Sequence, residues 1–338
     1  MFRPTRILIA AAAALALTAC AGSPDPSEAP DPSQSASPSG SPSASPSPTP
    51  TPTPTIPATS SLEGITVTGE RLEAPKVEFD KPLRIDKTRF EVLVPGEGPK
   101  AAADGMVTVH YYGVNARTGE VFDQSFSRGA PSSFELAGVI DGFREGLTGQ
   151  QPGSRVLIAV PGDAGYDEVY QIAPQFAPTG YELFDTLLFV ADVIDVSLPG
   201  ASGATVTPPA GLPTVSAGTG KPTVTIPAGD APATMTAQTL IEGTGRKVEA
   251  KDSILARYVG YSWKTGEIFD DGFETPTSEE LANLIPGWTK GLLGKTVGSR
   301  VLLVLPPADG FPEGANNPPV EKGDTVVYVV DLLFAFSS

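Results

Sequence analysis

An internal repeat constrains the fold of this chain more than any other feature. The segment VHYYGVNARTGEVFD at 109–123 returns as ARYVGYSWKTGEIFD at 256–270, an offset of 147 residues. The segment IDGFREGLTGQQPGSRVLIAVP, which begins at residue 140, returns from residue 285 as IPGWTKGLLGKTVGSRVLLVLP, an offset of 145. Self-similarity on this scale predicts two copies of one folding unit, each with its own core and its own site.

Each copy is predicted to be mainly β-structure. Stretches such as MVTVHYYGV at 106–114 alternate polar and apolar residues between glycine, proline and aspartate, which is typical of half-buried strands. One short helix is expected in each copy, over 140–147 and 285–293. We therefore expect an α+β fold in which an antiparallel sheet, a half-barrel, wraps around one short helix. Residues 61–90 should add strands ahead of the first copy.

Composition shifts divide the rest of the chain. Arg3 and Arg6 followed by the apolar run 7–17 predict an export signal over 1–20, too short to span a bilayer. Residues 21–59 are rich in Ser, Pro and Thr and predict a disordered tether. We expect a first domain at 60–198, a linker at 199–220 that lets the domains move independently, and a second domain at 221–338.

The single cysteine, Cys20, follows Leu-Thr-Ala at the end of the signal. This arrangement resembles the lipobox of bacterial lipoproteins, in which the cysteine carries the lipid, and it predicts an anchor on the extracytoplasmic face of the cell membrane. The alternative is an ordinary secretory signal with a chance cysteine.

Composition also argues against several classes of function. The chain has 39 acidic and 23 basic residues, a formal net charge of −16, which disfavours binding to nucleic acid. His110 is the only histidine and Cys20 the only cysteine. The chain therefore lacks the residues for the usual His/Cys metal sites, and a catalytic triad could use only His110. We expect no metal, no cofactor and a monomeric protein.

The repeated motifs occur in a specific order. Each copy has Tyr-x-Gly on a strand, Phe-Asp after a turn, Ile-x-Gly-aromatic at the start of the helix, and Gly-Ser-Arg before the next strand. In this order and at these spacings, about 90 residues of each copy resemble the FKBP-type peptidyl-prolyl cis-trans isomerases. The whole chain resembles a tandem-domain bacterial lipoprotein of the actinobacterial kind.

The resemblance implies a peptide-binding pocket in the first copy. Asp123 would accept a hydrogen bond from Tyr111 and pair with Arg128. The backbone N–H of Ile140 and the hydroxyl of Tyr166 would hold carbonyl groups of the bound peptide. The residues implied as catalytic are Tyr111, Phe122, Asp123, Ile140, Phe143, Tyr166 and Phe189, and those implied as substrate-binding are Arg128, Phe134 and Val139.

The second copy keeps most of this pattern and departs from it in two places. Phe311 stands where the first copy has Tyr166, and Thr275 aligns with Arg128. Both copies also lack the Ile-Pro-Pro type of loop before the last strand. The substrate-binding residues implied here are Tyr258, Phe269, Asp270, Leu284, Ile285, Trp288, Phe311 and Tyr328.

These residue types suit prolyl isomerisation. Rotation about an X–Pro bond faces a barrier of roughly 18–20 kcal/mol because twisting destroys amide resonance. An apolar aromatic cup favours the twisted amide, which is less polar than the planar one, and no nucleophile or proton shuttle is required. Phe122 and Phe269 taken singly could be core aromatics, but an acid beside a core aromatic must be solvated or paired, and here an acid follows both.

Three hypotheses follow. The leading one is an exported isomerase (EC 5.2.1.8) that assists the folding of exported proteins by acting on their proline-containing segments, with the first copy as the better catalyst. The second is a chaperone or scaffold that binds proline-containing peptides without turnover, favoured for the second copy by Phe311. The third is a purely structural surface spacer.

Overall fold

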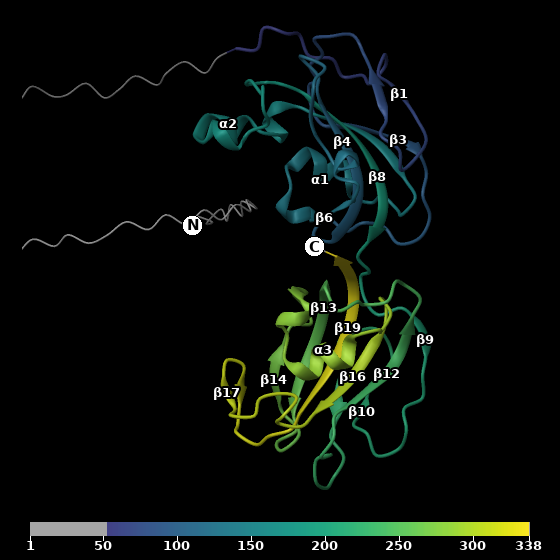
Figure 1. Cartoon of the computed structure of the whole chain (residues 1–338), viewed down its shortest axis with the longest axis vertical. Coiled ribbons are helices and arrows are strands. Elements are labelled where there is room, and N and C mark those ends of the chain that lie inside the picture. The colour runs from purple at the N-terminus through teal and green to yellow at the C-terminus, as the bar shows by residue number, and fades with distance from the viewer. Residues whose placement is uncertain (1–52, 338) are drawn as a thin grey trace, which may run out of the picture. The chain divides into compact units, whose positions relative to one another are not determined.

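The computed structural model describes residues 53–337 and shows two β-rich units, one for each copy of the repeat (Figure 1). The predicted signal, Cys20 and the tether up to residue 52 lie outside the described residues. Thr59 forms a bridge with Ile85, so the folded part of the first copy begins slightly before residue 60. No described helix is long and apolar enough to cross a membrane.

The first copy is a six-stranded antiparallel sheet. Its strands run in the order β3-β7-β8-β4-β5, and β6 pairs with β4 as well. Their bounds are β3 Arg89–Val94, β4 Met106–Asn115, β5 Val121–Gln124, β6 Ser132–Glu135, β7 Arg155–Val160 and β8 Leu187–Val196. The helix α1, Asp141–Leu147, lies against β7 and covers the inner face of the sheet.

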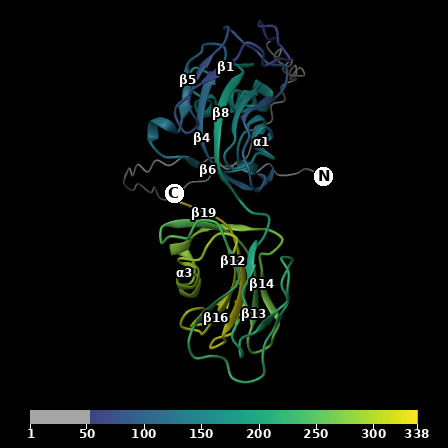
Figure 2. The same cartoon turned by 90° about the vertical axis from the view of Figure 1, so that its right-hand side faces the viewer.

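The second copy repeats this arrangement with one extra edge strand. The order is β14-β13-β19-β16-β12-β9, and β15 pairs with β13. The bounds are β9 Gly203–Thr205, β12 Thr236–Gly243, β13 Asp252–Ser262, β14 Ile268–Asp271, β15 Thr277–Glu280, β16 Arg300–Leu305 and β19 Val326–Ser337. Figure 2 shows α3, Pro286–Leu292, on one side of the curved sheet. The two predicted helices and the α+β class are thus confirmed.

Glycines let each helix pack closely on its sheet. A Cβ atom on Gly142 or Gly146 of α1 would collide with the side chains of Val160 and Ile158 on β7. In α3, Gly287 and Gly291 approach Leu305 and Leu303 on β16 in the same way. The spacing of four residues places both glycines of each pair on one helix face, so the Gly-x-x-x-Gly pattern fixes how the helix sits over the sheet.

The outer face of each sheet is covered by the chain that precedes it, which we call the strap: residues 60–86 in the first copy and 203–226 in the second. In the first strap, β1 Thr66–Thr68 and β2 Lys76–Glu78 form a hairpin of their own rather than joining the main sheet. In the second, β10 Thr214–Val215 pairs with β11 Val224–Thr225, and β9 pairs with β12. The segment expected to be a linker at 199–220 is therefore largely part of the second copy, and that expectation was wrong.

A buried ion pair fastens each strap. Arg155 and Asp192 face each other on β7 and β8 with an Nε–Oδ1 distance of 2.7 Å, and Arg155 also donates to the carbonyl of Gly69 at 2.7 Å. In the second copy Arg300 lies 2.6 Å from Asp331 and donates to the carbonyl of Gly218 at 2.7 Å. The arginine of the Gly-Ser-Arg motif thus anchors the strap in both copies.

The first copy has a second short helix that the sequence analysis missed. After β7 the chain forms α2, Asp167–Ile172, before it returns as β8. Asp167 is buried and accepts hydrogen bonds of 2.8 Å from the Tyr181 hydroxyl and the Phe184 amide. The second copy has no helix there, and carries instead the hairpin of β17 Ala315–Asn316 and β18 Pro319–Val320.

Candidate active site

The first cup is built from rings that four parts of the sequence contribute. Tyr111 comes from β4, Phe134 from β6, Phe143 from α1 and Phe189 from β8. The centroids of Phe143 and Phe189 are 4.9 Å apart, and those of Tyr111 and Phe134 are 5.8 Å apart. Phe122 on β5 meets Phe189 edge-on at 5.6 Å. The other predicted residues of this site, Val139, Ile140 and Tyr166, pack against the same core.

An aspartate at the rim of the first cup is held by two donors. Asp123 accepts a hydrogen bond of 2.5 Å from the Tyr111 hydroxyl. It also forms an ion pair with Arg128, with 2.8 Å between the guanidinium nitrogen and Oδ1. Arg128 also donates to the Tyr111 hydroxyl at 2.7 Å and lies 5.4 Å from its ring centroid. The resemblance predicted this geometry, and the structure confirms it.

The donors set the charge state of this rim. Partial burial alone would raise the pKa of Asp123, but the hydrogen bonds from Tyr111 and Arg128 outweigh it and lower the pKa. Burial and the neighbouring carboxylate raise the pKa of Tyr111 to about 12. At neutral pH the rim therefore carries an ionised aspartate, a neutral tyrosine and a paired arginine, with little net charge.

Two donors of the first cup have no acceptor within residues 53–337. They are the backbone N–H of Ile140, which precedes the first residue of α1, and the hydroxyl of Tyr166, which precedes α2. Burial raises the pKa of Tyr166, so its hydroxyl stays protonated and able to donate. The family resemblance implies that both groups hold carbonyl oxygens of a ligand.

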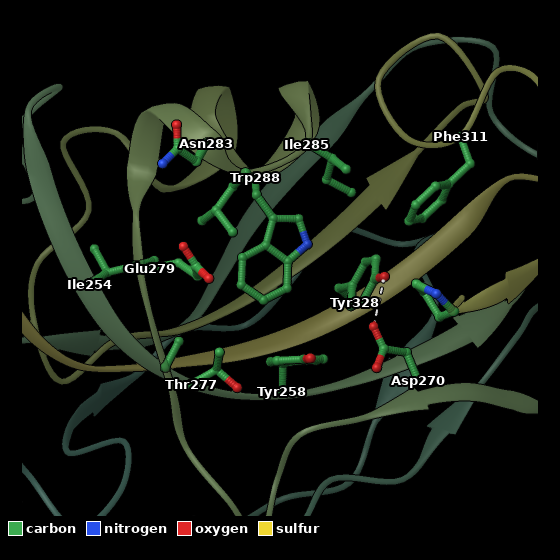
Figure 3. A pocket seen from close by; sticks show the side chains of 13 residues that line it. Ile254, Tyr258, Asp270, Thr277, Glu279, Asn283, Ile285, Trp288, Phe311 and Tyr328 are labelled. Atoms are coloured by element: carbon green, nitrogen blue, oxygen red, sulfur yellow. Dashed lines mark hydrogen bonds between the residues drawn. The ribbon is translucent and has the colours of Figure 1, made fainter. Parts of the chain in front are cut away.

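The second cup gathers the corresponding rings around a cavity of about 280 Å³ (Figure 3). Trp288 on α3 meets Tyr258 edge-on at 5.1 Å and Tyr328 at 5.2 Å. The ring centroid of Phe269 lies 5.5 Å from that of Tyr328 and 6.5 Å from that of Phe311. Leu284, Ile285 and Phe311 line the same cavity, so the predicted residues of this copy are also brought together.

The aspartate of the second cup has no basic partner within residues 53–337. Asp270 faces Gly260 in the strand register, as Asp123 faces Gly113, but it accepts a hydrogen bond of 3.2 Å from the Tyr328 hydroxyl. Burial raises the pKa of Asp270, and the hydrogen bonds from Tyr328 and Tyr258 offset it only in part. Thr275, which aligns with Arg128, lies exposed in the loop after β14.

Loop length explains the missing arginine. Asp123 and Ser132, the first residue of β6, are nine positions apart, and the short 3₁₀ helix Phe126–Arg128 lies between them. Asp270 and Thr277, the first residue of β15, are only seven positions apart, and no helical turn separates them. The shorter connection leaves out the turn that carries Arg128.

Two residues of the second cup were not predicted from the sequence. Glu279 lines the cavity from β15, although the acidic stretch SEEL at 278–281 locally favours a solvated loop. Pro318 also lines it, from the β17–β18 hairpin. By contrast, His110 is a strand residue as predicted: its Nδ1 lies 2.9 Å from Ser125 Oγ and its ring stacks on Phe126 at 4.8 Å.

Comparison with known proteins agrees with this geometry. The family model of FKBP-type peptidyl-prolyl cis-trans isomerase matches residues 98–194 and 244–333, more than half of the chain and both copies. The chain belongs to this family. It is thus a peptidyl-prolyl cis-trans isomerase of FKBP type with two tandem domains.

Three relatives each match about a third of the chain. A probable FK506-binding protein of Corynebacterium glutamicum is 36% identical over 124 residues, which cover 36% of this chain and 98% of that protein. The FK506-binding protein of Streptomyces anulatus is 34% identical over 127 residues, 37% of this chain and 98% of that protein. The isomerase Mip of Coxiella burnetii is 36% identical over 108 residues, 32% of this chain and 44% of that protein.

Proposed function

We propose that the first domain is the principal catalyst and that it isomerises X–Pro bonds in proteins that fold outside the cytoplasmic membrane. The observation that carries the assignment to the first domain is the set of groups at its rim. Asp123 is fixed by Tyr111 and Arg128, and Tyr166 presents a hydroxyl without an acceptor within the described residues. The second domain lacks both the arginine and this hydroxyl.

The first cup would act by selective binding of the twisted amide. The rings of Phe143 and Phe189 offer an apolar floor on which a proline ring can pack, and they exclude water from the amide. The Ile140 N–H and the Tyr166 hydroxyl would hold carbonyl oxygens on either side of the proline. Each 1.4 kcal/mol by which these contacts favour the twisted state accelerates rotation about tenfold.

The N-terminal sequence supports the proposed location outside the cytoplasmic membrane. Diacylation of Cys20 would attach the protein to the membrane, and the Ser/Pro/Thr-rich tether would hold the domains away from its surface. Changing Cys20→Ser should release the protein into the culture medium or soluble envelope fraction. Membrane attachment that persists in this variant would contradict the anchor.

A hydroxyl deletion tests the catalytic assignment. Tyr166→Phe should lower kcat/KM for a Leu-Pro peptide by about twofold to tenfold, the size of one neutral hydrogen bond. Tyr170→Phe is the matched control, since Tyr170 lies on the adjacent turn and is also half-buried. If both variants retain the full rate, Tyr166 does not contribute to catalysis and the assignment to the first cup loses its main support.

A further inference from the structure

Two positions in the wall of the second cup are acidic. The first cup has an apolar side chain at one of them and an aspartate paired with an arginine at the other. In the first domain Phe134 on β6 faces Val107 on β4. In the second domain the equivalent pairing on β15 and β13 joins Glu279 to Ile254. A carboxylate therefore replaces an aromatic ring in the wall of the cup.

Two carboxylates line this cavity without a base to neutralise them. Within residues 53–337, Asp270 has no arginine partner, and the side chain of Glu279 makes no hydrogen bond or ion pair. In Figure 3 Glu279 and Asp270 lie on opposite sides of the Trp288 ring. No lysine, arginine or histidine is among the residues that line the cavity.

The nearby lysines of this domain are engaged elsewhere. Lys290 lies 2.6 Å from Asp309, and Lys221 pairs with Asp271, which is not among the residues that line the cavity. Asp270 and Glu279 therefore line the cavity with no basic side chain beside them in its wall. A carboxylate pair with no counter-ion attracts a cationic group that reaches it.

Aromatic rings supply the second half of a cation site. Tyr258, Trp288 and Tyr328 surround the cavity, and indole and phenol faces bind an ammonium or guanidinium group through their quadrupoles. The same rings can pack against a proline. The cup thus has surfaces for a cation and for an adjacent apolar ring.

An unsatisfied donor also indicates a ligand. Trp288 is 6% exposed, and its indole N–H has no hydrogen-bond partner within the described residues. Buried donors in proteins are nearly always paired, so this group calls for an acceptor such as a peptide carbonyl. A peptide ligand would supply such an acceptor, whereas a free metal cation or amine would not.

We propose that the second cup binds prolyl peptides in which a lysine or arginine lies next to the proline, with Glu279 and Asp270 recognising the cationic side chain. The inference rests on the proposed function in one respect, since it assumes that the second domain shares the prolyl-peptide mode of the first. It assigns the two domains to different clients: apolar X–Pro segments to the first and basic ones to the second.

Tryptophan fluorescence of the intact protein tests this directly. The two tryptophans of the chain, Trp263 and Trp288, both lie in the second domain, so the first domain is silent. Trp263→Phe leaves Trp288 as the single probe inside the cup. This protein is titrated with three peptides that differ only in the residue before proline: Lys-Pro, Leu-Pro and Glu-Pro.

We expect Lys-Pro to bind about tenfold more tightly than Leu-Pro, the size of one exposed ion pair together with one cation–π contact. Glu-Pro should bind more weakly than either. Glu279→Gln should remove most of the preference, and Glu279→Phe, which restores the residue of the first cup, should reverse it. Glu280→Gln is the matched control, since Glu280 is the next residue of the strand and bonds to Asn283 instead.

The outcomes separate this inference from the proposed function. Equal affinity for Lys-Pro and Leu-Pro, or a preference that Glu280→Gln removes as fully as Glu279→Gln, would overturn the inference and leave catalysis by the first domain untouched. No fluorescence change with any peptide would overturn it too. The isomerisation rate of the same samples on Leu-Pro, and its dependence on Tyr166, decides the proposed function independently.

Discussion

The two cups share one scaffold and differ in the charge at their rims. Both place an aspartate opposite a glycine in the strand register and rings from a strand and a helix beneath it. In the first, Arg128 neutralises Asp123, and Phe134 completes an apolar wall. In the second, a loop two residues shorter removes the arginine, and Glu279 replaces the ring.

This difference teaches that the apolar floor and the charged rim can vary separately. The floor lies on strands that are buried in the sheet, where ring packing restricts substitution. The rim lies on a loop and an edge strand, which tolerate deletion and change of charge. Duplication of the domain therefore allows the rim of one copy to change while the rim of the other is kept.

The largest effect should come from the ion pair that both copies share. Arg300→Met leaves Asp331 buried and uncompensated, and should cost roughly 3–5 kcal/mol in the unfolding of the second domain. Urea denaturation followed by tryptophan fluorescence reports this domain. Arg155→Met should instead shift a transition seen by circular dichroism and leave the fluorescence transition in place.

The control for this experiment removes both charges. Arg300→Met with Asp331→Leu should recover much of the lost stability, because apolar replacement of a complete buried pair is often neutral. A single variant Arg300→Met that unfolds at the wild-type urea concentration would show that the strap is not held by this pair.

A medium effect should follow from the hydroxyl that the second cup lacks. Phe311→Tyr, made together with Asp123→Ala to silence the first domain, should raise the residual isomerisation rate by about twofold to tenfold. Protease-coupled or NMR exchange measurements on a Leu-Pro peptide detect such a change. An unchanged rate would mean that the missing hydroxyl is not what separates the two cups.

The smallest effect concerns the two aspartates and their opposite pKa shifts. The pKa of Asp123 is lowered below 3.8 by Tyr111 and Arg128 against its burial, so its ionised form stabilises the fold above pH 3.8 and this stability is lost as pH falls through the lowered value. The pKa of Asp270 is raised by burial, so its ionised form costs stability at neutral pH, and this cost disappears as pH falls.

Matched variants measure this contrast. At pH 7, Asp123→Asn should destabilise the first domain and Asp270→Asn should slightly stabilise the second, each by less than about 1 kcal/mol because both sites are partly solvated. Urea denaturation at pH 7 and near pH 4 is the test, and the contrast should shrink at the lower pH. Destabilisation of equal size by both variants would contradict the assignment of opposite charge environments.

Most of the site could be predicted from the sequence because the repeat and the family motifs supply its residues in order. Tyr111, Asp123 and Arg128 were expected to form one network, and they do. Glu279 was missed although the signal existed: the 145-residue offset, extended backwards, lays SSFEL at 132–136 on TSEEL at 277–281. The acidic composition of SEEL suggested a solvated turn, and strand pairing with β13 overrode it.

The straps could not be predicted in the same way. Residues 203–226 are rich in Pro, Gly, Ala and Thr, which locally favour a linker. Contacts with residues far away in the sequence hold this segment in place. Arg300 donates hydrogen bonds to the three consecutive backbone carbonyls of 218–220. Apolar side chains of the segment pack on the outer face of the sheet, namely Leu212, Val215, Val224 and Ile226. Such tertiary contacts leave no periodic pattern in the segment that they hold.

The most direct test of the account compares Asp123→Ala with Asp270→Ala in the intact protein, with kcat/KM for a Leu-Pro peptide as the readout. Asp123→Ala removes charge-assisted hydrogen bonds to Tyr111 and Arg128, and should lower the rate by about tenfold to a hundredfold. Asp270→Ala should leave it within about twofold. A loss of rate in Asp270→Ala, with Asp123→Ala unaffected, would show that the second cup is the catalyst and would contradict the division of roles between the two domains.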